Sequence, residues 1–458
     1  MRRLRREHNQ SQAQMAQAVG VSTAYINLLE NNQRSLSVKV LVSIADAYGV
    51  DWRDLIEEGS DRLLADLHTA VQDPLFNSNK PDIQELRLAV DHAPMLVENF
   101  LHLYSSHSNV IERVMETGDQ FSDSALLTSP EAIVHDFFRG HSNYFAVLDE
   151  CAESLRAEDQ CEPDDVYYWL KSRLRQRHNI EVNTASIEAM HQALRIYDKE
   201  GKKIILSEAL DFPNRKFQLA HMLGLIEFNQ QIEELVADIG DDKQTGKMRC
   251  RVELANYFAA ALLMPYSQFK KAAESLAYDI SRLAKTFGVS FEQTCHRLTT
   301  LQRNGDRGIP FFFIRIDRAG NVTKRFNASS ISIAEYGGSC PVWDLHAAFS
   351  NPGSILPQFV ELPDGKRFFT ISRTADRAAY SRNSQARRQA LSLGCELSYV
   401  ENIGYARAYN HDDEQLYGRI GINCRICPRQ SCAQRAHNPL VIELSVDPSR
   451  RGDTRLES

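Results

Sequence analysis

Apolar residues recur at helical spacing through much of the first half of the chain and alternate at strand spacing later on. Long amphipathic stretches between about residues 61 and 177 predict helices. After Arg177, the segments NIEVNTA and RIYDKEGKKIILSEAL predict short strands joined by a turn. Further strands are expected in IPFFFIRIDRAGNVTKRF and RFFTISRTA. The pattern indicates a multidomain protein that is mostly α-helical, with α+β domains in its second part.

The first 58 residues predict short helices joined by tight turns. Ser11 can cap a helix that Gly20 ends in the left-handed region, and Ser22 can cap the next helix. A third helix is expected from about Ser37 to Tyr48. Two short helices joined by a glycine turn form a helix-turn-helix, whose second helix enters the DNA major groove. The residues predicted to reach phosphates or base edges are Gln12, Ser22, Thr23, Tyr25, Asn27 and Arg34. The alternative is a small helical bundle that binds protein instead of DNA.

The segment from Phe217 to Pro265 carries part of a zinc-peptidase pattern. Such a site needs two histidines one helical turn apart, with a glutamate between them as general base. His221 holds the first position, but Met222 replaces the glutamate and Leu225 the second histidine. Neither side chain can bind zinc there or take a proton from water. The sequence therefore predicts a peptidase scaffold without its catalytic groups, and a protein that is not an enzyme.

A pocket that has lost its metal ligands can hold a small molecule. Basic and aromatic side chains lie near this segment, and together they suit a ligand with phosphates and a stackable ring, such as a nucleotide or a coenzyme A thioester. The other interpretation is that YYWLKSRLRQR is an amphipathic helix with a solvated basic face. The residues predicted to bind the ligand are Tyr167, Tyr168, Lys171, Arg175, Arg195, His221, Leu225 and Tyr257.

Three of the nine cysteines, Cys424, Cys427 and Cys432, lie together with the spacing C-x2-C-x4-C. A compact loop of this kind can turn three thiolates towards one centre, and such clustering favours ligation over disulfides. Cys340, which precedes Pro341, is the candidate for the fourth ligand. Four such thiolates favour a [4Fe–4S] cluster, with a zinc ion or unligated thiols as the alternatives. The remaining cysteines are expected to be buried structural residues.

Composition narrows the class of protein. A hydrophobic fraction of 43% with 25% charged residues is typical of a soluble globular protein. No apolar run approaches the roughly 18 residues of a membrane span, and no signal-peptide core follows the basic start. A cytoplasmic protein without membrane contact is therefore expected. The net charge of −7 argues against a surface uniformly suited to nucleic acid, but it permits one basic DNA-binding module.

Several segments resemble known families. SQAQMAQAVGVSTAYINLLENN resembles the Xre/Cro-type helix-turn-helix, and LAHMLGL with LANYFAAALLMPY resembles the ImmA/IrrE metallopeptidases. With CPVWDLHAAF and NCRICPRQSC added, the whole chain resembles the short-chain fatty acyl transcriptional regulators. The resemblance implies a DNA-binding regulator of propionate or acetate metabolism. It also implies that the protein senses a short-chain acyl-coenzyme A and carries an iron–sulfur cluster.

Four domains are expected. Residues 1–58 form the helix-turn-helix domain, 59–176 a helical linker and dimerisation domain, 177–302 a degenerate ImmA/IrrE-like sensing domain, and 303–458 an α/β domain with the cysteine-ligated cluster. The effector is expected near the relic helix, in a homodimer or homotetramer bound to double-stranded operator DNA. Two alternatives remain. In one, the protein is a redox or iron sensor whose signal is the cluster, and in the other it is a metallopeptidase that cleaves a repressor.

Overall fold

The computed structural model describes residues 10–30, 63–71, 81–117, 130–159, 165–191, 193–240, 243–329, 339–376 and 388–439, with a few single positions between them. The chain divides into two compact units, Met1–Asn109 and Val110–Ser458. Arg34 and, apart from three single positions, the predicted third helix of the helix-turn-helix domain lie outside the described residues. The predicted division into four domains stays a prediction.

The first unit contains the predicted helix pair. Helix α2 (Gln12–Val19) begins with a capping box at Ser11 and ends at Gly20, whose φ of 74° is left-handed. Helix α3 (Thr23–Glu30) begins at Ser22, whose hydroxyl accepts a backbone N–H of the first turn. The buried side chains shared by the two helices are Met15, Ala16, Val19 and Ile26. Both predicted caps and the glycine turn are confirmed.

Two further helices, α6 (Ile83–His92) and α7 (Pro94–Thr117), follow in the chain. Asp82 starts α6 with a capping box, and α7 starts at a proline, where a missing N–H costs least. These helices share an apolar core with residues 63–71, formed by Leu64, Leu67, Val71, Leu86, Val90 and Val97. The predicted amphipathic helices of this region are confirmed.

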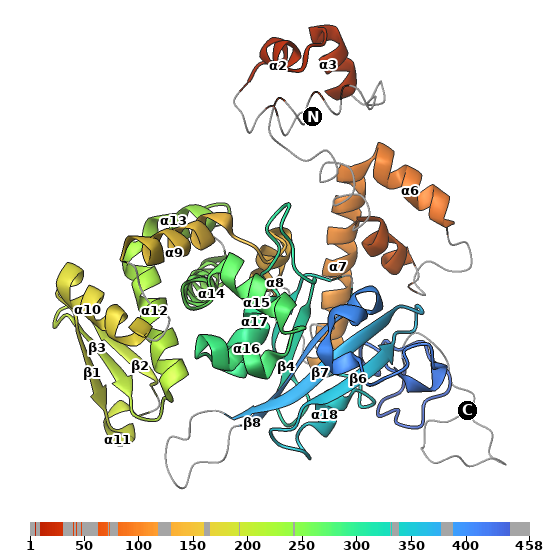
Figure 1. Ribbon diagram of the computed structural model, residues 1–458. Coiled ribbons are helices and arrows are strands. Elements are labelled where there is room, and N and C mark those ends of the chain that lie inside the picture. Colours follow the sequence, from red (N-terminus) through yellow and green to blue (C-terminus); the bar gives the residue numbers. More distant parts are fainter. Residues whose placement is uncertain are drawn as a thin grey trace. The chain divides into compact units, whose positions relative to one another are not determined.

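The second unit combines helices with a small three-stranded sheet (Figure 1). Its elements before the larger sheet are α8 (Pro130–Gly140), α9 (Ala146–Glu158), α10 (Val166–His178), β1 (Glu181–Ala185), α11 (Ile187–Met190), β2 (Arg195–Asp198), β3 (Lys203–Ser207), α12 (Phe212–Glu227), α13 (Asn229–Leu235), α14 (Gln244–Leu263), α15 (Tyr266–Ser275), α16 (Ile280–Phe287) and α17 (Phe291–Leu298). The small sheet has the order β1-β3-β2, with β1 parallel and β2 antiparallel to β3. The strands predicted after Arg177 are confirmed.

Helix α14 forms the centre of the main core. Almost every side chain from Leu254 to Leu263 is buried, which is typical of a helix that is apolar on all sides. Helices α8, α9 and α12 pack around it (Figure 1). Gly224 of α12 permits this close packing, because a Cβ there would lie only 2.7 Å from the ring of Phe258. The predicted packing of the apolar helix against the relic helix is confirmed.

A six-stranded sheet follows, with the order β5-β4-β8-β7-β6-β9. Its elements are β4 (Phe312–Ile316), β5 (Val322–Asn327), α18 (Asp344–Ala347), β6 (Leu356–Glu361), β7 (Arg367–Asp376), β8 (Arg388–Glu396), three short 3₁₀ helices (Leu397–Asn402, Gly404–Ala406, Glu414–Leu416) and β9 (Tyr417–Arg419). Strands β4, β5 and β7 were predicted from the sequence, whereas β6 and the central β8 were not. In the described part of the chain, no helix is long and apolar enough to cross a membrane.

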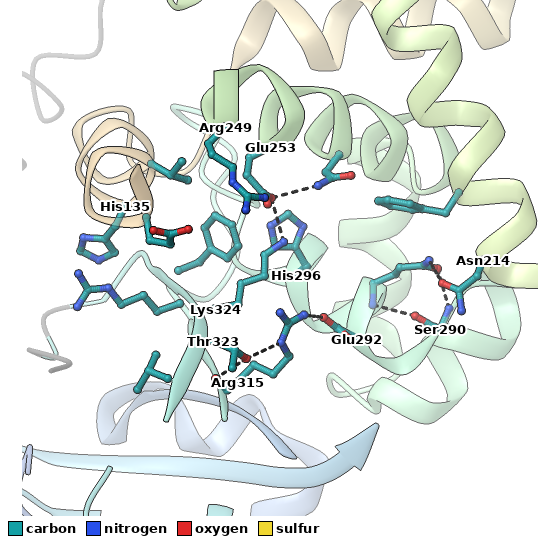
Figure 2. A pocket seen from close by; sticks show the side chains of 18 of the residues that line it. His135, Asn214, Arg249, Glu253, Ser290, Glu292, His296, Arg315, Thr323 and Lys324 are labelled. Atoms are coloured by element: carbon teal, nitrogen blue, oxygen red, sulfur yellow. Dashed lines mark hydrogen bonds and ion pairs between the residues drawn. The ribbon is translucent and has the colours of Figure 1, made fainter. Parts of the chain in front are cut away.

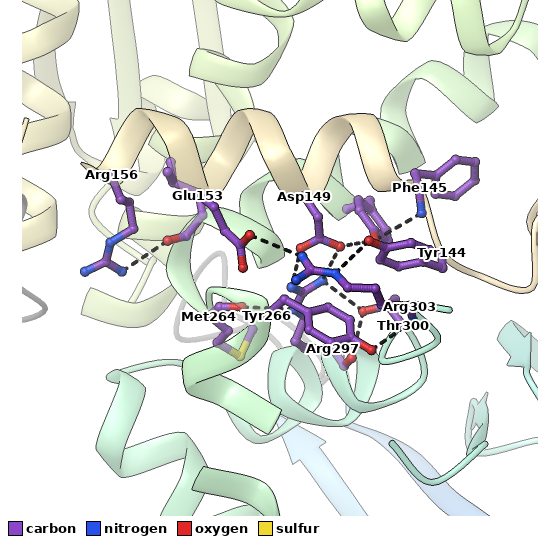
Figure 3. Close-up of polar contacts among 12 residues, drawn as sticks. Tyr144, Phe145, Asp149, Glu153, Arg156, Met264, Tyr266, Arg297, Thr300 and Arg303 are labelled. Carbon is purple, nitrogen blue, oxygen red and sulfur yellow. Dashed lines mark hydrogen bonds and ion pairs between the residues drawn. The ribbon is translucent and has the colours of Figure 1, made fainter. Parts of the chain in front are cut away.

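A polar network is enclosed between α9, α14 and α17 (Figure 3). The Arg297 guanidinium lies 2.5 Å from the Asp149 carboxylate, and both side chains have 0% exposure. Arg297 also donates hydrogen bonds to the Met264 carbonyl oxygen and to the Thr300 hydroxyl. The Tyr257 hydroxyl donates to Asp149, and it accepts the backbone N–H of Phe145. Nearly every polar group of the network therefore has a hydrogen-bond partner, and the network joins the three helices.

Candidate functional site

The residues predicted to contact DNA lie at the start of α2 and along α3. Gln12 is half-buried at the first position of α2, and Thr23 and Asn27 are exposed on α3. Tyr25 is half-buried, and Ser22 is exposed at the N-terminal end of α3. Since the N-terminal end of the second helix is the part that meets bases in this motif, the placement agrees with the predicted use of these residues.

The four predicted cysteine ligands line one small hollow. Cys340 precedes α18, and the other three lie in the loop after β9, so segments far apart in the sequence meet here. Burial raises the pKa of the Cys340 thiol, and the neighbouring Cys424 and Cys427 raise it further. Three guanidinium groups, those of Arg419, Arg429 and Arg435, line the same hollow. The structure thus brings together all four predicted thiols beside positive charge.

The surroundings of these thiols fit an anionic iron–sulfur centre. Arg435 is buried, donates to the carbonyl oxygens of Cys424 and Arg429, and keeps its Nε without a partner in the described part. A Cβ at Gly421 would lie 2.7 Å from the Cys427 Sγ, so glycine leaves space for that sulfur. Four thiolates carry negative charge that three guanidinium groups can offset. Among the described residues, no three ligand-type side chains surround a point that would suit a single metal ion.

A cavity of about 680 Å³ lies beside the relic helix (Figure 2). Its wall comes from α8, α12, α14, α17, β4 and β5. The charged and histidine side chains in that wall are Glu131, His135, Arg249, Glu253, Glu292, His296, Arg315, Lys324 and Arg325. Val134, Phe217, Val322 and Phe326 supply its apolar part. A cavity of this volume lies within the usual range for small-molecule sites, about 300–1,000 Å³.

Two ion pairs cross the cavity wall. Lys324 Nζ lies 2.9 Å from Glu253 Oε2, and Arg315 lies 2.5 Å from the Glu292 carboxylate. Burial alone would raise the pKa of Glu253, but the charge and hydrogen bond of Lys324 outweigh it and lower that pKa to about 2. Arg249 lies in the wall without an ion pair or hydrogen bond to other described residues. The cavity wall therefore contains two cations paired with carboxylates, Lys324 and Arg315, and one, Arg249, without such a pair among the described residues.

His296 of α17 is the most deeply buried titratable group in this wall, with 6% exposure. Burial lowers its pKa to about 3, and the charge of Lys324 acts in the same direction. Its Nε2 has no hydrogen-bond partner in the part of the chain that the structure describes. A neutral imidazole with an unused nitrogen therefore lies in the cavity wall.

The relic position His221 lies directly behind this wall. Its Nδ1 is 2.9 Å from Asn256 Oδ1, and Asn256 lines the cavity. Burial and the nearby charge of Arg195 lower the pKa of His221 to about 4. Arg195 in turn donates to the carbonyl and side-chain oxygens of Gln218, another residue of the wall. Arg195 and His221 thus lie close together, and each contacts a residue that lines the cavity.

None of the eight residues predicted to bind the ligand lines the cavity. Tyr167, Tyr168, Lys171 and Arg175 lie on α10, where Tyr168 is 69% exposed and Lys171 lies over the Tyr167 ring. Leu225 packs against the main core. Tyr257 is committed to the buried network with Asp149. The role of these eight residues in binding stays a prediction.

Arg249, Lys324 and His296 line the cavity and were not predicted from the sequence. Lys324 and Arg325 stand in the predicted strand VTKRF, and their polar pair at a strand edge was the available signal. His296 gave no signal, because an isolated histidine in an amphipathic helix is most often a packed residue. The contact between β5 and α8 that closes the cavity comes from tertiary packing.

Three family models match successive parts of the chain. A helix-turn-helix model covers residues 1–55, the IrrE N-terminal-like domain covers 175–299, and the C-terminal domain of the short-chain fatty acyl coenzyme A regulators covers 300–456. Together with the helix pair, these matches define a DNA-binding transcriptional regulator. The chain belongs to the short-chain fatty acyl coenzyme A regulator family, as its sequence resemblance predicted.

The names of individual relatives agree with this family assignment. The propionyl-CoA carboxylase regulator of Cereibacter sphaeroides is 35% identical over 454 residues, covering 99% of this chain and 96% of that protein. RamB of Mycobacterium tuberculosis is 34% identical over 456 residues (98% and 96%), and PrpR from the same organism is 33% identical over 461 residues (98% and 92%).

A solved Mycobacterium tuberculosis transcriptional regulator matches with a TM-score of 0.68 and 36% identity, covering 72% of this chain and all of that one. These relatives are named as regulators, so the expectation that the chain is not an enzyme is confirmed, and the peptidase alternative is wrong.

Proposed function

We propose that this regulator holds a [4Fe–4S] cluster on Cys340, Cys424, Cys427 and Cys432, and that a short-chain acyl-coenzyme A controls its binding to operator DNA. The observation that carries the proposal is the convergence of these four thiols from two distant segments on one hollow beside three arginines. Such a convergence requires folding of the whole C-terminal sheet, and it is not a local consequence of the C-x2-C-x4-C loop.

The four thiols are a donor set that a [4Fe–4S] cluster or a zinc ion can use, and the two centres differ in how widely the sulfurs are spread. A tetrahedral zinc ion needs four sulfurs about 2.3 Å from one point, whereas a cubane spreads its four thiolates over separate iron atoms. The cluster would supply a redox-active anionic centre. The chain's own contribution is to position the thiols and to offset their charge with arginines.

The effector is supported by two further observations. The matched family model is named for a short-chain fatty acyl coenzyme A regulator, and one relative is named a propionyl-CoA carboxylase regulator. The cavity of about 680 Å³ is large enough for a nucleotide-sized ligand. A homodimer or homotetramer would place two helix pairs on two half-sites. The effector would act by binding more tightly to one arrangement of those helix pairs than to the other.

Anaerobic purification tests the cluster. We expect a brown protein with broad visible absorption and about four irons and four sulfides per chain. Cys427→Ser should abolish both, because it removes one ligand, whereas the matched control Cys151→Ser lies outside the site and should keep them. Stoichiometric zinc in place of iron, or an unchanged cluster in the Cys427→Ser variant, would refute the assignment.

A further inference from the structure

We infer that Arg435 is the counter-cation of the hollow lined by the four cysteines, and that its buried charge and its unused Nε–H make the proposed cluster easier to reduce. The inference rests on the proposed function and deepens it, because it names the residue that would set the reduction potential of that centre. Reduction would transfer one electron from an external one-electron reductant, and it would form or break no bond.

Arg435 is a buried cation without a carboxylate beside it. Arg435 and Arg173 are each 5% exposed, and Arg297 is fully buried. Arg173 pairs with two carboxylates and Arg297 with one, whereas Arg435 has no ion pair with any described residue. An isolated charge is costly to remove from water, so a buried guanidinium requires an anion nearby. No described Asp or Glu lines the hollow, and the cysteines, as thiolates, are the lining groups that can supply that negative charge.

The guanidinium of Arg435 is held against the cysteine loop through both of its terminal nitrogens. Nη1 donates to the Cys424 carbonyl oxygen at 3.3 Å, and Nη2 donates to the Arg429 carbonyl oxygen. The Nε–H has no acceptor among the described residues. A buried polar atom without a partner is rare in folded proteins, because its desolvation is not compensated. A sulfur of the proposed centre would supply the missing acceptor.

The other two arginines of the hollow differ from Arg435. Arg429 donates to the Ile420 carbonyl oxygen at 3.3 Å and to the Glu361 carbonyl oxygen at 2.8 Å, so it fastens the cysteine loop to the end of β6. Arg419 ends β9 and is exposed, so water screens its charge. Of the three, Arg435 is the one that combines a buried charge with an unused donor.

A fixed positive charge beside an iron–sulfur cluster favours the reduced state of that cluster. Reduction makes the centre one unit more negative, and a nearby cation stabilises the more negative state. Hydrogen bonds to the sulfurs act in the same direction, and both effects help to set the reduction potential of such clusters. The charge of Arg435 acts strongly because the residue is buried, where salt and water screen it little. Loss of this charge should therefore make the cluster harder to reduce.

Redox titration of the full-length protein, purified anaerobically and reduced with dithionite, tests the inference. Arg435→Gln removes the charge, so we expect the equilibrium constant for reduction to fall about tenfold or more, which lowers the midpoint potential by about 59 mV or more for a one-electron couple. Arg435→Lys keeps the charge and should recover most of that shift. Arg419→Gln at the hollow and Arg407→Gln away from it each remove an exposed charge, and both should stay within about twofold of the wild type.

Three results would overturn the inference while the proposed cluster stands. The first is an Arg435→Gln variant that keeps its iron and whose reduction constant stays within about twofold of the wild type. The second is an equal shift in Arg407→Gln, which would be a general effect of net charge. The third is an Arg435→Lys variant that shifts as far as Arg435→Gln, because the charge would then have no role.

Iron content decides the remaining cases. If Arg435→Gln binds no iron, a full iron content in Arg435→Lys supports the counter-charge, and loss of iron there as well overturns it in favour of packing. Wild-type protein without iron refutes the proposed cluster and this inference together.

Discussion

Arg297 and Asp149 show how much a single pair of residues can determine in this fold. Their charges lie within the main core at 0% exposure, where an isolated charge would be too costly to bury. The pair is tolerated because Thr300, Tyr257 and the Met264 carbonyl oxygen complete its hydrogen bonds. The stabilising contribution of the pair depends on both partners being present.

Asp149→Ala should therefore be severely destabilising. It leaves the Arg297 guanidinium buried without a counter-charge, and we expect a loss of about 3–5 kcal/mol in unfolding free energy, measured by urea denaturation. Asp149→Leu with Arg297→Met should recover most of that loss. Glu274→Ala, which breaks a partly exposed pair with Lys270, should cost less than about 1 kcal/mol. A single Asp149→Ala variant as stable as the wild type would contradict the account.

At the scale of elements, α3 is the one on which DNA recognition depends. Tyr25→Ala with Asn27→Ala should abolish the salt-dependent gel shift of an operator fragment, because both side chains lie on the helix expected in the major groove. Gln84→Ala, on the exposed side of α6, should leave the shift intact. Far-UV circular dichroism checks that the helices remain. A persistent shift in the double variant would mean that another element reads the operator.

Elements with strong local signals were predictable from the sequence. Ser11 and Gly20 bound α2 by local capping chemistry, and the apolar run through Tyr257 required a buried helix. The central strand β8 was missed because it is buried on both faces, so its side chains do not alternate between apolar and polar.

For the candidate sites, the spacing of Cys424, Cys427 and Cys432 and the proline after Cys340 identified four residues that line one hollow. The cavity beside the relic helix could not be outlined from the sequence, because Lys324 and His296 come near Glu253 only through tertiary packing.

At the scale of the whole molecule, the helix pair lies in the first compact unit, and the cavity and cysteines lie in the second. Any effect of the effector on DNA binding must be reciprocal, since both ligands bias the same equilibrium. We expect operator DNA to change the affinity for propionyl-coenzyme A by the same factor, typically about 5- to 150-fold, by which propionyl-coenzyme A changes the affinity for DNA. Calorimetric titrations with and without the operator measure both factors. Unequal factors would mean that a further bound species or an assembly step takes part.

The positions of the cysteines have a consequence for the lifetime of the protein. Strands β6, β7 and β8 all lie between Cys340 and Cys424 in the chain, so a centre joining these residues closes a long loop around most of the sheet. Such a cross-link restricts the unfolded chain and stabilises the sheet through the entropy of loop closure. Loss of the centre would populate open states that proteases degrade. With the proposed cluster, iron supply would then set how long each regulator molecule survives.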